Sequence, residues 1–173
     1  MKRGFIKILL VVIVLVSCLF NGIRQLNGRV NNLNDLFFNG ENNDQLSVHY
    51  DLVKIDDSLS YFISLSNKYM KSNELDSLNQ LHKEFQYLES IEQYSQWYND
   101  VKDLYPKAIA ELKDYTLTKQ HLSMLSKYEA TLNSAIHTIS YASFNQEVKD
   151  YQKDTDNLLS NMMKSFVQGV GTF

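Results

Sequence analysis

A basic start followed by an uninterrupted apolar run is the feature that most constrains this chain. Lys2, Arg3 and Lys7 are followed by the apolar residues 8–16, and no charged residue occurs across residues 8–23. Such a start is typical of an export signal or a membrane anchor. Because basic residues beside an apolar segment stay on the cytoplasmic side, the pattern predicts a membrane-bound chain whose remainder faces outside the cytoplasm.

The sequence is consistent with two forms of the segment 1–20 in the mature protein. As a retained transmembrane helix, the uncharged residues 8–23 extend about 24 Å at about 1.5 Å per residue, slightly less than the roughly 30 Å of a bilayer core. Alternatively, residues 15–18 (Leu-Val-Ser-Cys) resemble a bacterial lipobox, in which the cysteine is acylated and the preceding peptide is removed. Cys18 is the only cysteine of the chain. It is therefore the lipidation candidate, and both forms stay open.

The charge of the remainder argues against nucleic acid as a partner. The chain has 17 basic and 20 acidic residues, and removing residues 1–18 leaves 14 basic against 20 acidic, a formal charge of −6. An acidic domain lacks the positive groups that neutralise phosphates. A single cysteine allows no intramolecular disulfide, so a core must hold the exported domain together, and a chain of this length can bury one.

Helical periodicity governs the rest of the chain. Pro106 is the only proline, glycine is sparse, and apolar residues recur three to four positions apart, which predicts helices. The first helix, which starts in the anchor, is expected to end at Gly40, a residue type that suits a C-terminal cap. Asp44 is expected to cap a second helix at about residues 45–71.

Two longer helices are expected to follow. The third starts near residue 73, and its apolar stripe shifts by one position near residue 90 without ending; Pro106 predicts a break or kink. The last runs without a break to the end of a domain at residues 21–168, before a flexible tail at 169–173. The pattern predicts an all-α fold, an antiparallel four-helix up-and-down bundle after the anchor. Its expected core contains Leu52, Leu59, Phe85, Leu88, Leu132, Ile136, Val148 and Tyr151.

Five short motifs occur in order along nearly the whole chain. They are Phe20-Asn21-Gly22-Ile23 with Val30, Tyr50-Asp51-Leu52-Val53, Tyr105-Pro106, Phe144-Asn145 with Val148 and Tyr151, and Leu158-Leu159-Ser160-Asn161-Met162-Met163. In order and approximate spacing they resemble the LemA family, small membrane-anchored bacterial proteins with a helical-bundle domain. The resemblance implies a fold and an anchored location, and it implies no activity. Some positions depart from the family, such as Lys54 in place of a proline.

The residues that could carry chemistry are scattered. None of the four histidines pairs with another at helical spacing, so no metal site or other cofactor is expected. Glu129 occupies a position on the apolar stripe of the last helix, where a buried carboxylate would need a partner; we interpret it as a boundary residue. Tyr94, Trp97 and Tyr98 are interpreted as core and core edge, and exposed they would instead form a partner-binding patch. No catalytic residues are recognised.

Three functions are compatible with these observations. The first is a membrane-anchored helical module outside the cytoplasm that binds an envelope protein or associates with itself, and it is not an enzyme. The second is an enzyme or enzyme accessory with an unrecognised carboxylate or histidine site, which a buried cluster of Glu129 with a histidine would favour. The third is a binder of a small ligand in the bundle core. A flat, exposed aromatic patch would favour the first.

Overall fold

Helices joined by short connections make up the described part of the chain. The computed structural model describes residues 2–40 and 47–156, without the side chains of residues 2–9 and 11, and these residues contain no strand. The expected all-α class is confirmed. The helices are α1 (Lys2–Asn39), α2 (Val48–Ser66), α3 (Asn73–Phe85), α4 (Ile91–Lys113), α5 (Lys119–Ser140) and α6 (Ser143–Asp154).

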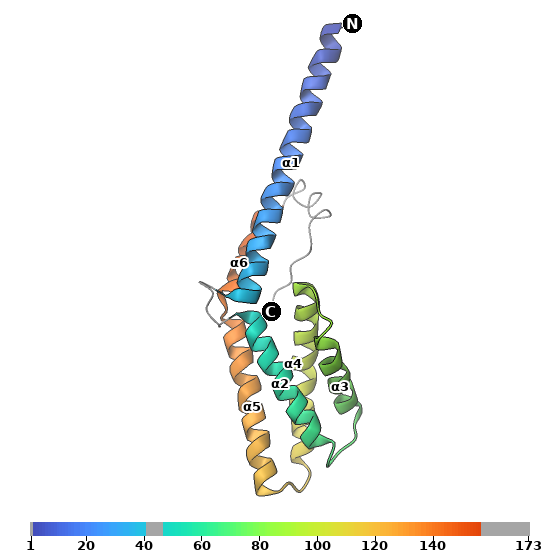
Figure 1. Cartoon of the computed structure of the whole chain (residues 1–173), viewed down its shortest axis with the longest axis vertical. Coiled ribbons are helices and arrows are strands. Elements are labelled where there is room, and N and C mark those ends of the chain that lie inside the picture. Colours follow the sequence, from blue (N-terminus) through green and yellow to red (C-terminus); the bar gives the residue numbers. More distant parts are fainter. Residues whose placement is uncertain (1, 41–46, 157–173) are drawn as a thin grey trace.

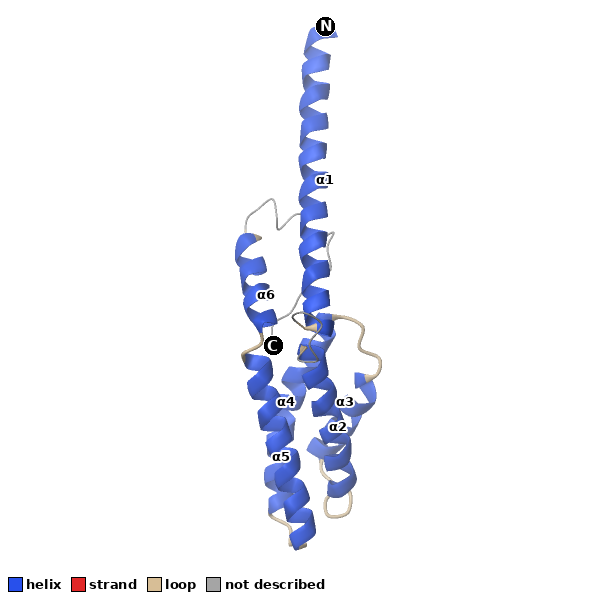
Figure 2. Ribbon diagram, turned by 60° about the vertical axis from the view of Figure 1, so that its left-hand side comes forward, coloured by secondary structure: helices blue, strands red, loops and turns tan. Residues whose placement is uncertain are grey.

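Two regions make up the molecule (Figure 1). Helices α2, α3, α4 and α5 lie side by side and run in alternating directions; we call them the bundle. Within it, α2 packs against each of the other three. Residues 23–39 of α1 and α6 stand beyond the end of the bundle where α2 begins, packed against each other (Figure 2); we call them the arm. The four bundled helices are therefore not the four segments predicted, because α1 and α6 pair outside the bundle.

The predicted third helix is wrong in its continuity. It is two helices, since α3 ends at Phe85 and α4 begins at Ile91. A capping box sets the new start: the Ser90 hydroxyl accepts from the Gln93 N–H, and the Gln93 side chain accepts from the Ser90 N–H. This reciprocal pair satisfies N–H groups that have no partner within the helix. The one-residue shift of the apolar stripe thus marks a helix boundary.

Two other helix boundaries also differ from the prediction. Pro106 lies inside α4, which continues to Lys113; the burial of Tyr105 and of Ala108 on either side offsets the lost hydrogen bond of a helix-interior proline. The last predicted helix breaks after Ser140, and α6 begins at Ser143. Its expected continuation beyond residue 156, and the tail at 169–173, lie outside the described residues.

The end of α1 and the start of α2 each have a cap. Gly40 ends α1 with φ of 72° and donates to Leu36 O at 3.0 Å, as expected for a glycine cap in the left-handed region. The predicted cap Asp44 lies outside the described residues. The N-cap of α2 is Ser47, whose side chain accepts from Tyr50 N–H at 3.1 Å.

The buried face of α5 contains Leu132 as expected, but it differs from the predicted face at Ile136. Leu122 is exposed and Ile136 is half-buried, and Glu129, with 37% of its side chain exposed, pairs with Lys113 at 2.7 Å. Tyr128 takes the core position instead, so the expected boundary role of Glu129 agrees with the structure. Phe85 and Leu88 only pack against the edge of the core. The buried positions of α5 are Leu125, Tyr128, Leu132, Ala135 and Ile139.

Candidate functional site

An aromatic cluster joins the arm to the bundle. Phe37, at the end of α1, is fully buried, and its ring centroid lies 5.4 Å from both Tyr94 of α4 and Phe144 of α6. His49 packs edge-on against Tyr94 at 5.3 Å and lies 5.0 Å from Phe38. Burial among these rings lowers the pKa of His49 below its ordinary value of 6.5, because a charged imidazole loses hydration there.

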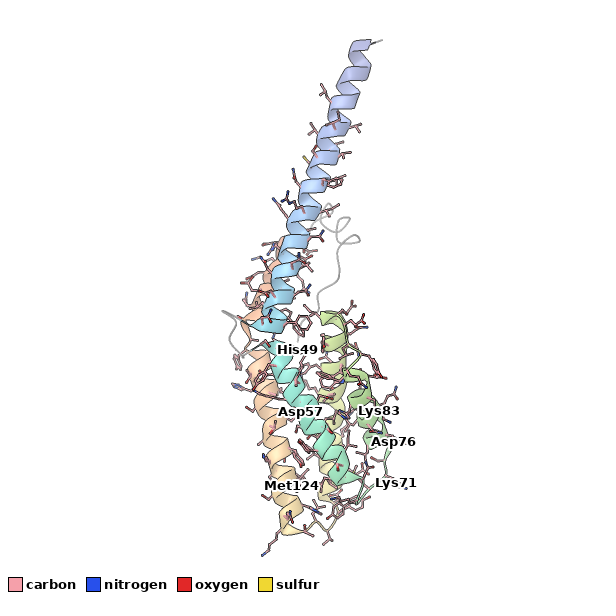
Figure 3. All side chains as sticks on the ribbon, viewed as in Figure 1. His49, Asp57, Lys71, Asp76, Lys83 and Met124 are labelled. Atoms are coloured by element: carbon pink, nitrogen blue, oxygen red, sulfur yellow. The ribbon has the colours of Figure 1, made fainter. Side chains whose placement is uncertain are left out.

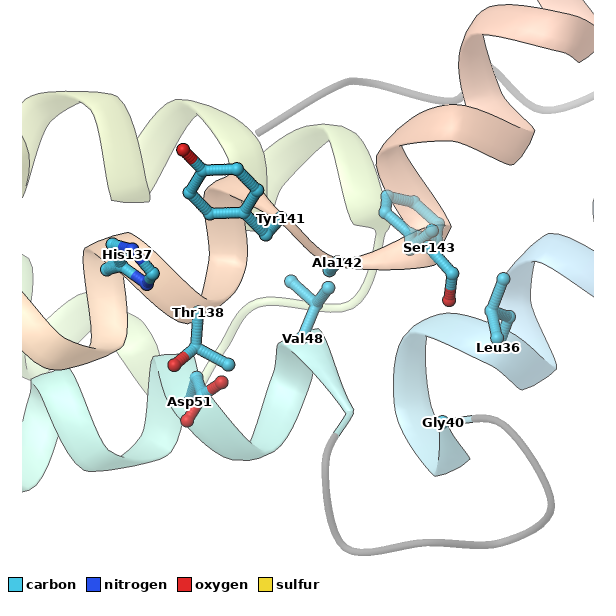
Figure 4. Close-up of a pocket in the computed structure, with 10 residues that line it drawn as sticks. Leu36, Gly40, Val48, Asp51, His137, Thr138, Tyr141, Ala142 and Ser143 are labelled. Carbon is cyan, nitrogen blue, oxygen red and sulfur yellow. The ribbon is translucent and has the colours of Figure 1, made fainter.

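A hollow of about 500 Å³ opens beside this cluster, where α1, α2, α5 and α6 meet. Asp51 of α2 and Thr138 of α5 point toward one another at its wall (Figure 4). Asp51 is only 3% exposed, and its carboxylate accepts from Lys54 Nζ at 3.0 Å. A buried carboxylate needs such a partner. The wall is completed by Leu36, Gly40, Val48, His137, Tyr141, Ala142, Ser143 and Phe144.

The turn between α5 and α6 shapes one side of this junction hollow. Asn145 is buried, and its side-chain amide donates to Ile139 O at 2.7 Å. Ile139 O lies in the last turn of α5, where carbonyls lack partners within the helix, and it also accepts from Ala142 N–H at 3.1 Å. The Asn145 bond fixes the direction in which α6 leaves. Tyr141 is 79% exposed and its ring lies 4.8 Å from that of His137. The hollow offers hydrogen-bond groups to a small polar molecule.

A second depression, of about 440 Å³, follows the seam between α2 and α5; we call it the groove. Tyr61 is 63% exposed, and its ring stacks on that of Tyr128 at 6.1 Å and 8°. Beneath it, the Ser58 hydroxyl lies 3.3 Å from the Tyr105 hydroxyl, and burial raises the pKa of Tyr105. Figure 3 shows Asp57 and Met124, on the two adjacent helices that form the groove.

The three aromatic residues considered for partner binding are buried. Tyr94 belongs to the junction cluster, and Trp97 packs 4.6 Å from Phe85 and donates from Nε1 to Leu81 O at 2.9 Å. Tyr98 is 2% exposed. Their placement agrees with the interpretation as core, and the patch alternative fails here because none of the three reaches the surface. Exposed tyrosines lie elsewhere, among them Tyr61, which the sequence did not single out.

Glu129 and two of the histidines each pair with one side chain from another segment of the chain. The ion-pair partner of Glu129 is Lys113, His82 Nδ1 lies 2.8 Å from Asp56 Oδ1, and His121 Nδ1 is paired with the Tyr69 hydroxyl. Desolvation raises the pKa of Asp56, partly opposed by His82. In the described part of the chain, no three His, Cys, Asp or Glu side chains gather as metal ligands would.

Cys18 lies on α1 with its side chain exposed. Apolar side chains are exposed on all sides of α1 around it, among them Leu15 at 58% and Phe20 at 75%. Counting only the residues whose placement is described, no helix is both long and apolar enough to cross a membrane. No protein-family model, no curated protein and no solved structure matches this chain.

Sequence reasoning missed the junction hollow and the groove for different reasons. Asp51 belongs to the motif Tyr50-Asp51-Leu52-Val53. Its position in the hollow depends on the packing of four helices, which no local sequence pattern predicts. The groove did leave a signal. On α2 its residues are Lys54, Asp57, Ser58 and Tyr61, and on α5 they are Met124, Lys127, Tyr128 and Thr131. Each set has the spacing i, i+3, i+4, i+7, which is one helical face.

Proposed function

We propose that this chain is a membrane-anchored protein outside the cytoplasm whose helical bundle binds another envelope protein or a second copy of itself. The observation that carries the proposal is the continuity of α1. From Leu10 to Phe20 apolar side chains are exposed around the helix, and from Leu26 to Phe37 the same helix packs into the arm. A helix that is apolar all round is suited to lipid rather than to water.

Either anchor leads to the same architecture. With a retained helix, α1 passes directly from lipid into the arm. With an acylated Cys18, about eight residues, or roughly 12 Å of helix, separate the lipid from Leu26, the first buried residue of the arm. The basic residues Lys2, Arg3 and Lys7 set the same orientation in both cases. The bundle is therefore proposed to stand off the outer surface of the membrane.

The LemA resemblance agrees with an anchored location, and several of its motif residues are buried. Val30 of α1, Asp51 of α2 and Asn145 of α6 are all buried, and they lie where the arm meets the bundle or within the arm. Tyr105 is fully buried at the centre of the bundle. Phe20 and Tyr50 of the same motifs are exposed, and the last motif, residues 158–163, lies outside the described residues. We propose kinship with LemA on the order and approximate spacing of the five motifs.

Three experiments test the proposal. Protease added to intact spheroplasts is expected to remove the bundle from the membrane fraction; protection until lysis would contradict the orientation. Mass spectrometry of the mature N-terminus separates the anchors, because a free Met1 indicates a retained helix and a lipid on Cys18 indicates processing. Crosslinking followed by co-purification from native membranes is expected to recover a protein partner or a dimer, and finding only the monomer would contradict the binding role.

The junction hollow favours binding of a small polar ligand as a second candidate function. Its volume of about 500 Å³ lies within the roughly 300–1,000 Å³ typical of ligand pockets, and Asp51 places a buried carboxylate in its wall. Asp51→Asn keeps the shape and removes the charge. If the hollow holds a cationic ligand, metabolite co-purification is expected to recover it from the parent and not from this variant.

A further inference from the structure

We infer that the groove between α2 and α5 is a self-association surface, on which a second copy of this chain packs about a twofold axis parallel to the bundle helices. The inference rests on the proposed membrane tether, since copies anchored in one membrane share one orientation. Its occupant is a second copy because the groove is complementary to itself in charge.

The centre of the groove is an apolar surface exposed to solvent. Tyr61 is 63% and Met124 36% exposed, and Tyr61 is held flat against Tyr128 by ring stacking. A stacked tyrosine loses little conformational freedom on binding, which is why such side chains serve as interface anchors. A second copy would cover Tyr61 and Met124 with the same two side chains of its own.

The borders of the groove carry one exposed charge of each sign. Asp57 lies on α2 and Lys127 on α5, and neither takes part in an ion pair within the described part of the chain, unlike the neighbouring Lys54, which pairs with Asp51. A twofold axis along the groove brings α2 of one copy against α5 of the other. Asp57 then faces Lys127 of the second copy, and the symmetry repeats this pair on the other side of the axis.

The tether agrees with this geometry. Helices α2 and α5 run antiparallel along the long axis that α1 continues (Figure 1), so a twofold axis parallel to them lies along the membrane normal. Rotation about it keeps every residue at its own distance from the membrane. Asp57 and Lys127, which border the same depression, therefore meet at matching levels. Confinement to one membrane raises the effective concentration, so a small interface suffices.

The direct test is photocrosslinking of the full chain in its native membranes. Two copies with tags of different length are co-expressed, each with the photoreactive residue p-benzoylphenylalanine in place of Tyr61. The expected product is a dimer that carries both tags. Tyr87, 73% exposed after the end of α3, is the matched control position and is expected to give none. Adducts at position 61 with other proteins and no dimer would overturn the inference.

Charge reversal tests the symmetry itself. Asp57→Lys and Lys127→Glu each replace two attractive pairs by two repulsive ones, and each alone is expected to lower the dimer yield about tenfold, which corresponds to about 1.4 kcal/mol. Co-expressing the two variants is expected to restore the yield in mixed dimers. On one side of the axis the two introduced side chains then attract each other, and on the other side the native Asp57 still faces the native Lys127. Asp103→Lys, an exposed reversal in the middle of α4, is the control and leaves the yield unchanged.

The outcomes separate this inference from the proposed function. Mixed rescue in the membrane fraction supports both. If the chain remains in membranes but co-expression restores nothing, the self-association surface is overturned and the tether stands. If the chain is found in the soluble fraction and the mixed dimer still forms, the surface stands and the tether fails. A foreign protein bound in the groove would not be rescued by mixing the two variants.

Discussion

The bundle and the arm bury their apolar stripes equally well but by different means. In the bundle, Leu132 and Phe62 are enclosed by several helices. In the arm, Val30 and Val148 are buried to a similar degree although α1 and α6 are the main elements that meet there. The exposed fraction of a residue therefore does not tell how many helices its side chain holds together. Among the helices that the structure describes, a bundle side chain joins several, whereas an arm side chain joins mainly α1 and α6.

The largest effect is expected from a truncation in the bundle. Leu132→Ala removes a side chain that is 2% exposed, and such truncations cost about 2–5 kcal/mol. Because α5 packs most extensively on α2, the whole bundle is expected to lose stability in denaturant unfolding. Ile136→Ala, on the same helix but half-buried, is the matched control and is expected to cost clearly less. Equal losses would show that the face of α5 is misassigned.

That contrast also shows how far the sequence could predict the fold. Spacing of apolar residues predicted helices and the core residues Leu52 and Leu59 of α2, and residue type predicted the cap at Gly40. Spacing did not fix the whole buried face of α5, because Tyr128 and Glu129 are adjacent, and a tyrosine fits both the core and its edge. The break before α4 was readable from Ser90 and Gln93, which form a capping box. The junction hollow could not be predicted from the sequence, because it depends on the directions in which α1 and α6 leave the bundle.

The next largest effect is expected where the two regions are joined. Asn145→Ala removes the 2.7 Å bond to Ile139 O, which keeps its 3.1 Å bond from Ala142 N–H, so the expected cost is that of one hydrogen bond, about 0.5–1.5 kcal/mol. Because the bond directs α6, the loss is expected to appear first as faster amide hydrogen exchange in α6, with α2 to α5 protected as before. Uniform loss of protection in both regions would argue that arm and bundle unfold as one unit.

A smaller effect is expected at the outer end of the arm. Arg29 pairs with Asp154 at 3.1 Å and lies 5.4 Å over the ring of Tyr151. Both ionic side chains are more than a third exposed, so solvent screens the pair, and Arg29→Ala is expected to cost at most about 1 kcal/mol. Exchange is expected to rise only in the last turn of α6. Arg24→Ala, on the exposed part of α1, is the control, and an equal effect there would exclude a specific role of the pair.

The smallest effect is expected from pH, and it acts at the junction of the two regions. Burial lowers the pKa of His49 below 6.5, so at mildly acidic pH the unfolded chain binds a proton that the folded chain resists. The contribution of neutral His49 is complete above the unfolded pKa of about 6.5 and declines as the pH falls through it towards the lower folded value. Acidification from about pH 7.5 to 5.5 is therefore expected to weaken the contact between arm and bundle, because His49 packs on Phe38 of α1 and Tyr94 of α4.

His49→Gln separates this contribution from the other titrating groups. The variant carries no charge at either pH, and it is expected to lose less stability on acidification than the parent, measured as the shift of the denaturant midpoint between the two pH values. Asp56, whose pKa is raised mainly by burial, titrates in parent and variant alike and cancels in the comparison. If the variant lost as much stability on acidification as the parent, burial of His49 between the two regions would not be the cause of the pH dependence.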